Sequence, residues 1–140
     1  MVAFTLFKSA SLLALVSSLV SAAPLDTCDY FRVTSPNTYF TTTAGECQQV
    51  SYDYSGPAPA PLVSIDLYEY STDKFISSLV QNVTGTGPAS PWFNINLNGY
   101  NTTADYYFLV SYGPGCDAIK TQNFHVLYNP NSPPAVCPQQ

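Results

Sequence analysis

Charge is scarce in this sequence, and positive charge is the scarcest. Only 9% of its 140 residues are charged, with four Lys or Arg against nine Asp or Glu. Proteins that bind nucleic acid need clustered Lys and Arg to displace counterions from phosphates, and docking on anionic lipid needs the same residues. The composition therefore argues against a nucleic-acid partner and against binding to a lipid surface.

Long apolar runs are also absent, apart from one short run near the N-terminus. Lys8 precedes this run, which covers residues 10–20, and small residues follow it. A helix needs about 20 apolar residues to span a bilayer, so no membrane span is expected. This order of features predicts a secretory signal peptide at residues 1–22. Cleavage is expected after Ala22, because a cut one residue later would place Pro24 directly behind it.

Residues 23–140 are then expected to form a single domain that is secreted and extracellular. Low charge does not indicate disorder here, because eleven Tyr, eight Phe and one Trp are available for a core. Once Lys8 is removed, three cations against nine acids leave a net charge of about −6. A domain of about 118 residues buries roughly two thirds of its unfolded surface, so no metal or other cofactor is needed for folding.

All four cysteines lie in the expected mature part, and an even number in a secreted chain predicts two disulfides. Their wide spacing excludes a zinc knuckle, which needs close pairs of ligands. Four cysteines allow three pairings, and the spacing alone does not choose among them.

Alternation of apolar and polar residues dominates the sequence after the signal peptide. Gly, Pro, Asn, Ser and Thr clusters interrupt it every eight to twelve residues, which is typical of an all-β protein. The expected strands are Tyr30–Thr34, Glu46–Tyr54, Leu62–Tyr70, Phe75–Val83, Trp92–Leu97, Asp105–Tyr112 and Ile119–Tyr128. About seven short antiparallel strands favour an immunoglobulin-like β-sandwich.

The same alternation assigns side chains to strand faces. Val63, Ile65 and Leu67 share one face, and Tyr106, Phe108, Val110 and Tyr112 share another, with Phe124 and Val126 opposite the latter. Tyr106 opens its strand in a position that resembles a tyrosine corner, in which the phenol bonds back to the backbone. An ordinary core tyrosine explains the position equally well.

The sandwich topology favours one disulfide pairing. The first strand of such a sandwich runs alongside the last, and the second runs opposite to the first. Cys28 and Cys116 then lie at one end, because each precedes its strand. Cys47 opens the second strand and Cys137 follows the last, which places both at the other end. The predicted pairs are Cys28–Cys116 and Cys47–Cys137.

Catalytic signatures are weak. His125 is the only histidine, and we expect it on the outer face of a strand. A Ser-His-Asp triad stays open, but no motif marks a particular serine. The acids available for a glycosidase pair are Asp53, Asp66, Glu69, Asp73 and Asp105. Solvation at the surface explains these acids more simply, so we predict no catalytic residue, no metal site and no enzymatic activity.

Two kinds of surface site are predicted. Asn82 and Asn101 each begin an Asn-X-Thr sequon, and in a secreted chain both are candidate N-glycosylation sites. Tyr68 and Tyr70 share the polar face of one expected strand, where the flat rings are suited to stacking against sugar rings. The alternative for both tyrosines is that they only stabilise the sheet, which is the interpretation we prefer for Tyr52 and Tyr54.

Several short motifs resemble the fungal Ser/Thr-rich, GPI-anchored cell-wall protein family, which includes yeast proteins required for β-1,6-glucan assembly. The motifs are Val33–Asn37, Thr43–Gly45, Val50–Tyr52, Val63–Leu67, Ile76–Val83, Trp92–Ile95 and Asp105–Val110, and the similarity covers about residues 30–127. The resemblance implies an immunoglobulin-like domain at the fungal surface with no established catalytic residues. The sequence has no long Ser/Thr-rich stalk, and its polar end, Cys137–Gln140, lacks the hydrophobic tail of a GPI signal. We therefore expect free secretion or non-covalent association with the wall.

Three functions follow as hypotheses. The first is a non-catalytic extracellular or cell-wall protein that associates with wall polysaccharide such as glucan, or organises the wall, through Tyr68 and Tyr70. The second is a secreted effector or inhibitor that binds an extracellular protein through the Pro-rich loop Gly56–Pro61. The third is a hydrolase, which would need a concave cleft with two inward carboxylates.

Overall fold

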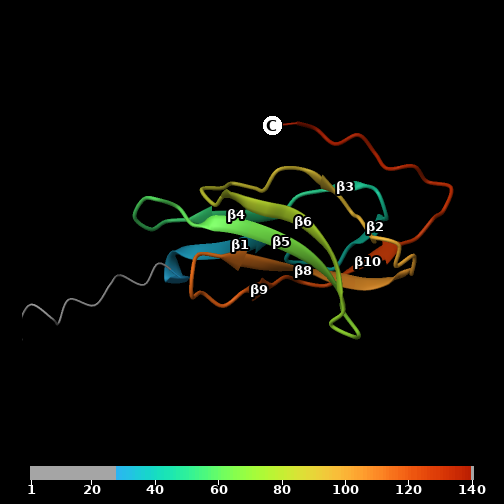
Figure 1. The fold of residues 1–140 in the computed structure, drawn as a ribbon, viewed down its shortest axis with the longest axis horizontal. Coiled ribbons are helices and arrows are strands. Elements are labelled where there is room, and N and C mark those ends of the chain that lie inside the picture. Colours follow the sequence, from blue (N-terminus) through green and yellow to red (C-terminus); the bar gives the residue numbers. More distant parts are fainter. Residues whose placement is uncertain (1–27, 140) are drawn as a thin grey trace, which may run out of the picture.

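The computed structural model describes residues 28–139, so the expected signal peptide and its cleavage site lie outside the described residues. The chain is nearly all β, which confirms the fold class at that level (Figure 1). Its elements are the 3-10 turn η1 (Cys28–Tyr30) and the strands β1 (Phe31–Ser35), β2 (Thr41–Thr43), β3 (Cys47–Gln48), β4 (Ser51–Tyr54), β5 (Leu62–Glu69), β6 (Phe75–Thr84), β7 (Phe93–Asn94), β8 (Ala104–Tyr112), β9 (Ile119–Lys120) and β10 (Phe124–Leu127).

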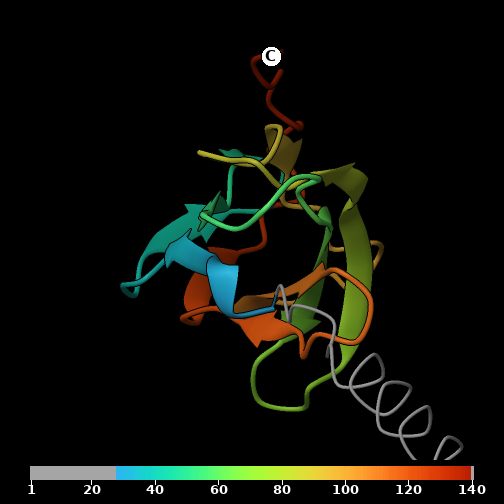
Figure 2. The ribbon, with the colours of Figure 1, turned by 90° about the vertical axis from the view of Figure 1, so that its left-hand side faces the viewer.

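The strands form a β-sandwich-like arrangement of one large sheet and two small ones. The large sheet has the order β2-β10-β8-β5-β6, and β9 adds to β8. The small sheets pair β1 with β4 and β3 with β7. All pairs are antiparallel except β2 with β10, which is parallel. Figure 2 views the molecule from one end, with β1 and β4 on one side of the interior and β5 and β6 on the other.

Two expected strands are interrupted, and one strand was missed. Glu46–Tyr54 divides into β3 and β4, where the buried Ser90 hydroxyl accepts a hydrogen bond from the Val50 N–H at 3.1 Å. Ile119–Tyr128 divides into β9 and β10, where the Thr121 hydroxyl accepts from the Phe108 N–H at 3.0 Å. In both places a side-chain oxygen replaces the backbone carbonyl of a regular ladder, and period-two patterning does not detect that exchange.

The missed strand is β2, which is made of three threonines and shows no apolar alternation. Its inward residue, Thr42, is buried and donates its hydroxyl to Glu46 Oε2 at 2.8 Å. The expected strand Trp92–Leu97 is also wrong in length, since only Phe93 and Asn94 pair with β3. The remaining expected strands agree with β1, β5, β6 and β8 to within one residue at each end.

The core lies between the large sheet and the two small ones. The predicted inward faces of β5 and β8 are confirmed: Val63, Ile65, Leu67, Tyr106, Phe108 and Val110 are all fully buried and Tyr112 nearly so. Phe124 lies directly across from Tyr106 in the register of β10 and β8. Its ring centroid is 4.6 Å from that of Phe108, so aromatic packing within the large sheet continues toward its β2 edge.

The predicted tyrosine corner is present at the start of β8. Tyr106 has no exposed surface, and its hydroxyl donates to the Thr102 carbonyl oxygen at 2.6 Å. Burial, with a smaller effect from the negative charge of Glu69, raises the pKa of Tyr106 to about 12. The phenol therefore stays protonated and remains a donor, which fixes the bend of the chain that leads into β8.

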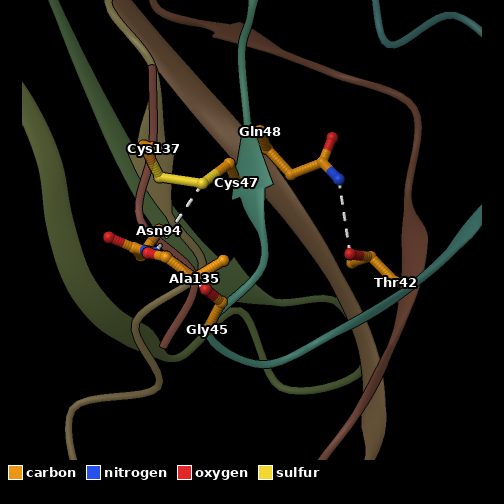
Figure 3. The surroundings of a disulfide bond; sticks show 7 residues. All are labelled: Thr42, Gly45, Cys47, Gln48, Asn94, Ala135 and Cys137. Atoms are coloured by element: carbon orange, nitrogen blue, oxygen red, sulfur yellow. Dashed lines mark hydrogen bonds between the residues drawn. A yellow bond between two sulfur atoms is a disulfide. The ribbon is translucent and has the colours of Figure 1, made fainter. Parts of the chain in front are cut away.

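Both disulfides join the pairs that the sandwich topology predicts. Cys28 is bonded to Cys116 and Cys47 to Cys137, each with a Cα–Cα distance of 5.5 Å. The second bond holds the C-terminal tail, which leaves β10 and turns back past β3 (Figure 1). Asn94 supports it by donating to the carbonyl oxygens of Gly45 and Ala135 at 2.7 and 2.8 Å (Figure 3).

Replacing Cys47 and Cys137 together with Ser should lower the free energy of unfolding by about 4 kcal/mol, because the unfolded chain regains the entropy of a long loop. The bond closes a sequence separation of 90 residues. Chemical denaturation of the oxidised proteins measures the difference. The matched control replaces Cys28 and Cys116, which are 88 residues apart, and should show a similar loss. A variant as stable as the wild type would contradict the prediction.

Tyr106→Phe should lower the free energy of unfolding by about 1 kcal/mol, since it removes one short hydrogen bond and leaves the ring in place. Tyr30→Phe is the control, because Tyr30 is partly exposed and its hydroxyl makes no hydrogen bond to residues 28–139. Urea denaturation curves with equal midpoints for Tyr106→Phe and wild type would show that the corner does not stabilise the fold.

Candidate functional site

The outer face of the large sheet carries a row of aromatic rings across three strands. In the register of the sheet, Tyr68 of β5 lies between Phe75 of β6 and Tyr107 of β8. The ring centroids are 5.6 Å apart on both sides, edge-on toward Phe75 and stacked toward Tyr107. Tyr70, just after β5, meets Tyr107 edge-on at 6.4 Å. These four residues form the aromatic patch.

The patch has a floor and two exposed sides. Tyr107 is only 5% exposed and forms the floor, whereas Tyr70 and Phe75 are 47% and 50% exposed. Tyr68 is partly buried between them. Tyr68 and Tyr70, the predicted ligand contacts, therefore lie in one cluster on one face, together with two rings that were not predicted.

A lysine and an aspartate hold the floor of the patch in place. Lys120 of β9 lies over the Tyr107 ring, with Nζ 4.1 Å from the ring centroid, and 3.5 Å from Asp73 Oδ1. The Tyr107 hydroxyl donates to the same oxygen at 2.7 Å. That hydrogen bond, helped by the Lys120 charge, lowers the pKa of Asp73, while burial raises the pKa of Tyr107 to about 12. These contacts hold the Tyr107 ring in place beneath the exposed rings of Tyr70 and Phe75.

A polar cluster lies beside the patch on the same face, and it consists of Tyr39, Asp105, Asn123 and His125. Asp105 is its centre: Oδ1 lies 2.9 Å from His125 Nδ1 and accepts from the Tyr39 hydroxyl at 3.1 Å. Oδ2 accepts from Asn123 Nδ2 at 3.2 Å. The bond with His125 is the main reason that the pKa of Asp105 is lowered. His125 is part-exposed, in agreement with the expected outer position.

The polar cluster and the aromatic patch are contiguous. Asp105 precedes Tyr107 by two residues in β8, so their side chains leave the same side of the sheet. The Tyr70 N–H also donates to the Asp105 carbonyl oxygen at 2.9 Å. An apolar stacking surface therefore adjoins a set of hydrogen-bonding groups, which is the combination that a sugar ring needs from a binding site.

Four of the five acids considered for a glycosidase pair have separate partners, and the fifth, Asp66, lies partly buried on the outer face of β5. Asp53 accepts two hydrogen bonds from Arg32 Nε, Asp73 is bonded to Tyr107, and Asp105 belongs to the polar cluster. Solvation at the surface was the wrong interpretation for Glu69, which is 5% exposed because it continues the inward face of β5. The Ser71 hydroxyl donates to Glu69 Oε1 at 2.6 Å, and this bond lowers the pKa of Glu69.

Sequence reasoning missed Phe75, Tyr107 and Lys120. A signal for Tyr107 was available, because it lies between the inward residues Tyr106 and Phe108 and must point outward. The position of Phe75 depends on the register between β5 and β6, which has several irregularities. Lys120 reaches the patch only because β9 pairs with β8 at Leu109 and Val110.

No protein-family model matches the sequence, and no curated protein is significantly similar to it. Within residues 28–139, no helix has the length and apolar character to cross a membrane. The same residues contain no group of three or more His, Cys, Asp or Glu placed to hold a metal ion.

Acid should destabilise the protein partly through Asp105. The pKa of Asp105 is lower in the folded protein than in the unfolded chain, so its ionised form stabilises the fold. This stabilisation is complete above about pH 4, the usual pKa of a free Asp, and it is lost as the pH falls through the lowered pKa of the folded state. The melting temperature of wild type should therefore fall more steeply than that of Asp105→Asn between about pH 4 and pH 2.

Asp117→Asn is the control for this comparison, since Asp117 is exposed and its carboxylate makes no hydrogen bond or ion pair within residues 28–139. Its melting curve should follow wild type at every pH. Parallel pH profiles for wild type and Asp105→Asn would rule out the stabilising role of the polar cluster.

Proposed function

We propose that this protein is a non-catalytic, secreted protein of the fungal cell wall or extracellular space that associates with wall polysaccharide through the outer face of its large sheet. The observation that carries the proposal is the aromatic patch with its adjoining polar cluster. Two disulfides in a small domain fit an oxidising, extracellular location. The resemblance to fungal cell-wall proteins supports the choice of polymer.

The strand order supports an immunoglobulin-like fold for this domain. β1 and β2 act as one edge strand divided between the two layers, since β1 pairs with β4 and β2 pairs in parallel with β10. Seven strands remain if β1 with β2, β3 with β4 and β9 with β10 are each counted as one interrupted strand. The tyrosine corner at Tyr106 lies where immunoglobulin-like sandwiches have theirs, at the start of the strand before the last.

A neutral polysaccharide fits the chemistry of the outer face better than a charged ligand. Lys120, which lies over the Tyr107 ring, is already paired with Asp73, so its positive charge is balanced beside the patch. Three neighbouring strands also span about 10 Å, which gives a row of rings long enough for more than one contact with a linear polymer. Stacking of sugar C–H groups on Tyr70 and Phe75 supplies apolar contact, and the polar cluster supplies hydrogen bonds.

A protein partner is the competing function, and one feature favours it. A groove of about 520 Å³ lies against the Pro-rich loop that the effector hypothesis selected. Leu62 in its wall is 56% exposed and, with the neighbouring prolines, gives the groove an apolar surface that a protein partner could cover. A stable complex with an extracellular protein, together with no retention on any wall polymer, would favour this second function.

Co-sedimentation with insoluble β-glucan and with chitin tests the proposal. Tyr70→Ala and Phe75→Ala should each weaken retention about three- to tenfold, since one aromatic contact is worth about 0.5–1.5 kcal/mol beyond its buried area. Both rings are half-exposed, so the fold should tolerate their loss. Circular dichroism of each variant checks that the domain remains folded.

Trp92→Ala is the matched control, because Trp92 is a partly exposed aromatic next to β7, in the opposite layer. Its retention should equal that of wild type. Full recovery of the wild-type protein in the supernatant with every polymer would remove the proposal, and an equal loss for Trp92→Ala would show that retention is not specific to the patch.

A further inference from the structure

A second region of the outer face, at the opposite end of β5 from the aromatic patch, contains a groove beside a glycosylation sequon. The groove, of about 520 Å³, is called the proline groove, and its walls include Pro59, Pro61, Leu62, Ser64, Ser111 and Pro114. Asn82, the acceptor of the Asn-Val-Thr sequon, is itself one of its lining residues. A covalently attached sugar at this asparagine would therefore start at the edge of an apolar depression.

The local backbone presents the Asn82 side chain to solvent. Between the register pairs Ile65↔Val80 and Val63↔Val83, strand β6 has two residues where β5 has one, so Asn82 belongs to a bulge. Its φ of 52° is in the left-handed region, which asparagine tolerates better than most residues. The Asn82 N–H donates to the Ser64 hydroxyl at 3.1 Å. Its side-chain amide makes no hydrogen bond to residues 28–139.

We propose that Asn82 carries an N-linked glycan whose first N-acetylglucosamine residues pack into the proline groove. The modification forms a bond between Asn82 Nδ2 and C1 of the sugar, supplied by a lipid diphosphate-linked oligosaccharide. The C1–O bond to the diphosphate breaks, the amide loses one proton, and the lipid diphosphate leaves. This inference does not depend on the proposed polysaccharide association.

The groove has the composition that an N-acetylated sugar requires. Proline rings and the half-exposed Leu62 offer apolar surface to the C–H face and the acetyl methyl group. The hydroxyls of Ser64 and Ser111, which face each other in the register of β5 and β8, offer hydrogen bonds to the acetamide. Because the glycan is tethered at the groove, its effective concentration is high, and weak contacts suffice to hold it.

The second sequon gives an internal comparison. Asn101 lines a different groove of about 410 Å³, whose walls include Asn94, Asn96 and Asn98 and residues of the C-terminal tail. Five asparagines contribute to the wall of that groove, and it offers a sugar less apolar surface than the proline groove does. A glycan at Asn101 is therefore a glycosylated control without the proposed packing.

The test begins with secretion of the full chain from a yeast host and measurement of its intact mass. Asn82→Gln and Thr84→Ala should each remove the mass of one glycan, and Thr84→Ser, which keeps the sequon, should retain it. Absence of a glycan on wild-type Asn82 would overturn the proposal at this step.

Hydroxyl-radical footprinting then tests the packing. Leu62 should be labelled at least threefold more slowly in the glycosylated protein than in Asn82→Gln, because the sugar covers it. Leu127, which is 43% exposed on β10 and outside the proline groove, should be labelled equally in both. Asn101→Gln should leave the rate at Leu62 unchanged.

Enzymatic removal of the glycan from folded wild-type protein provides the same comparison with a different side chain, because complete release leaves an aspartate at position 82. Release at Asn82 should raise the labelling rate of Leu62, and trimming to a single N-acetylglucosamine should keep most of the protection. Equal labelling of Leu62 in the glycosylated and released proteins would show that the glycan extends into solvent, and would overturn the proposed packing.

Discussion

The unbroken pairing of β5 with β8 is the constraint on which the rest of the structure depends. Seven consecutive residue pairs connect these strands, from Val63↔Tyr112 to Glu69↔Tyr106, without a register shift. Because successive side chains alternate between faces, this register places the core residues inward and the rings of Tyr68 and Tyr107 outward at the same time. A slip by one residue would exchange the two sets. The core and the candidate binding face are therefore fixed by the same backbone hydrogen bonds.

Away from this central pair, the strands are short and their regular ladders are incomplete. Buried hydroxyls of Ser90 and Thr121 accept backbone hydrogen bonds where β3–β4 and β9–β10 are interrupted. The Asn94 side chain and the Cys47–Cys137 bond then secure the tail against β3 (Figure 3). Side chains and disulfides thus complete a fold in which β2, β3, β7 and β9 have only two or three residues each.

The sequence predicts local features of this protein better than features that depend on register. Alternation identified the inward face of β5 and the outward pair Tyr68 and Tyr70, since both follow from period two within one strand. It did not identify Phe75 and Lys120, because their positions depend on how β6 and β9 pair with their neighbours. Glu69 was misjudged for a related reason, since a lone acid in an alternating strand can be buried when a neighbouring hydroxyl, here that of Ser71, hydrogen-bonds it.

The two disulfides interlock along the chain, and this has a consequence for resistance to proteolysis. The span from Cys28 to Cys116 overlaps the span from Cys47 to Cys137. A protease that cuts the backbone once, anywhere between Cys28 and Cys137, therefore leaves two fragments that are still joined by at least one covalent bridge. Exposed loops such as the Pro-rich segment can be nicked without release of either piece, so proteolytic loss of the domain requires a second cut or reduction of the bridges.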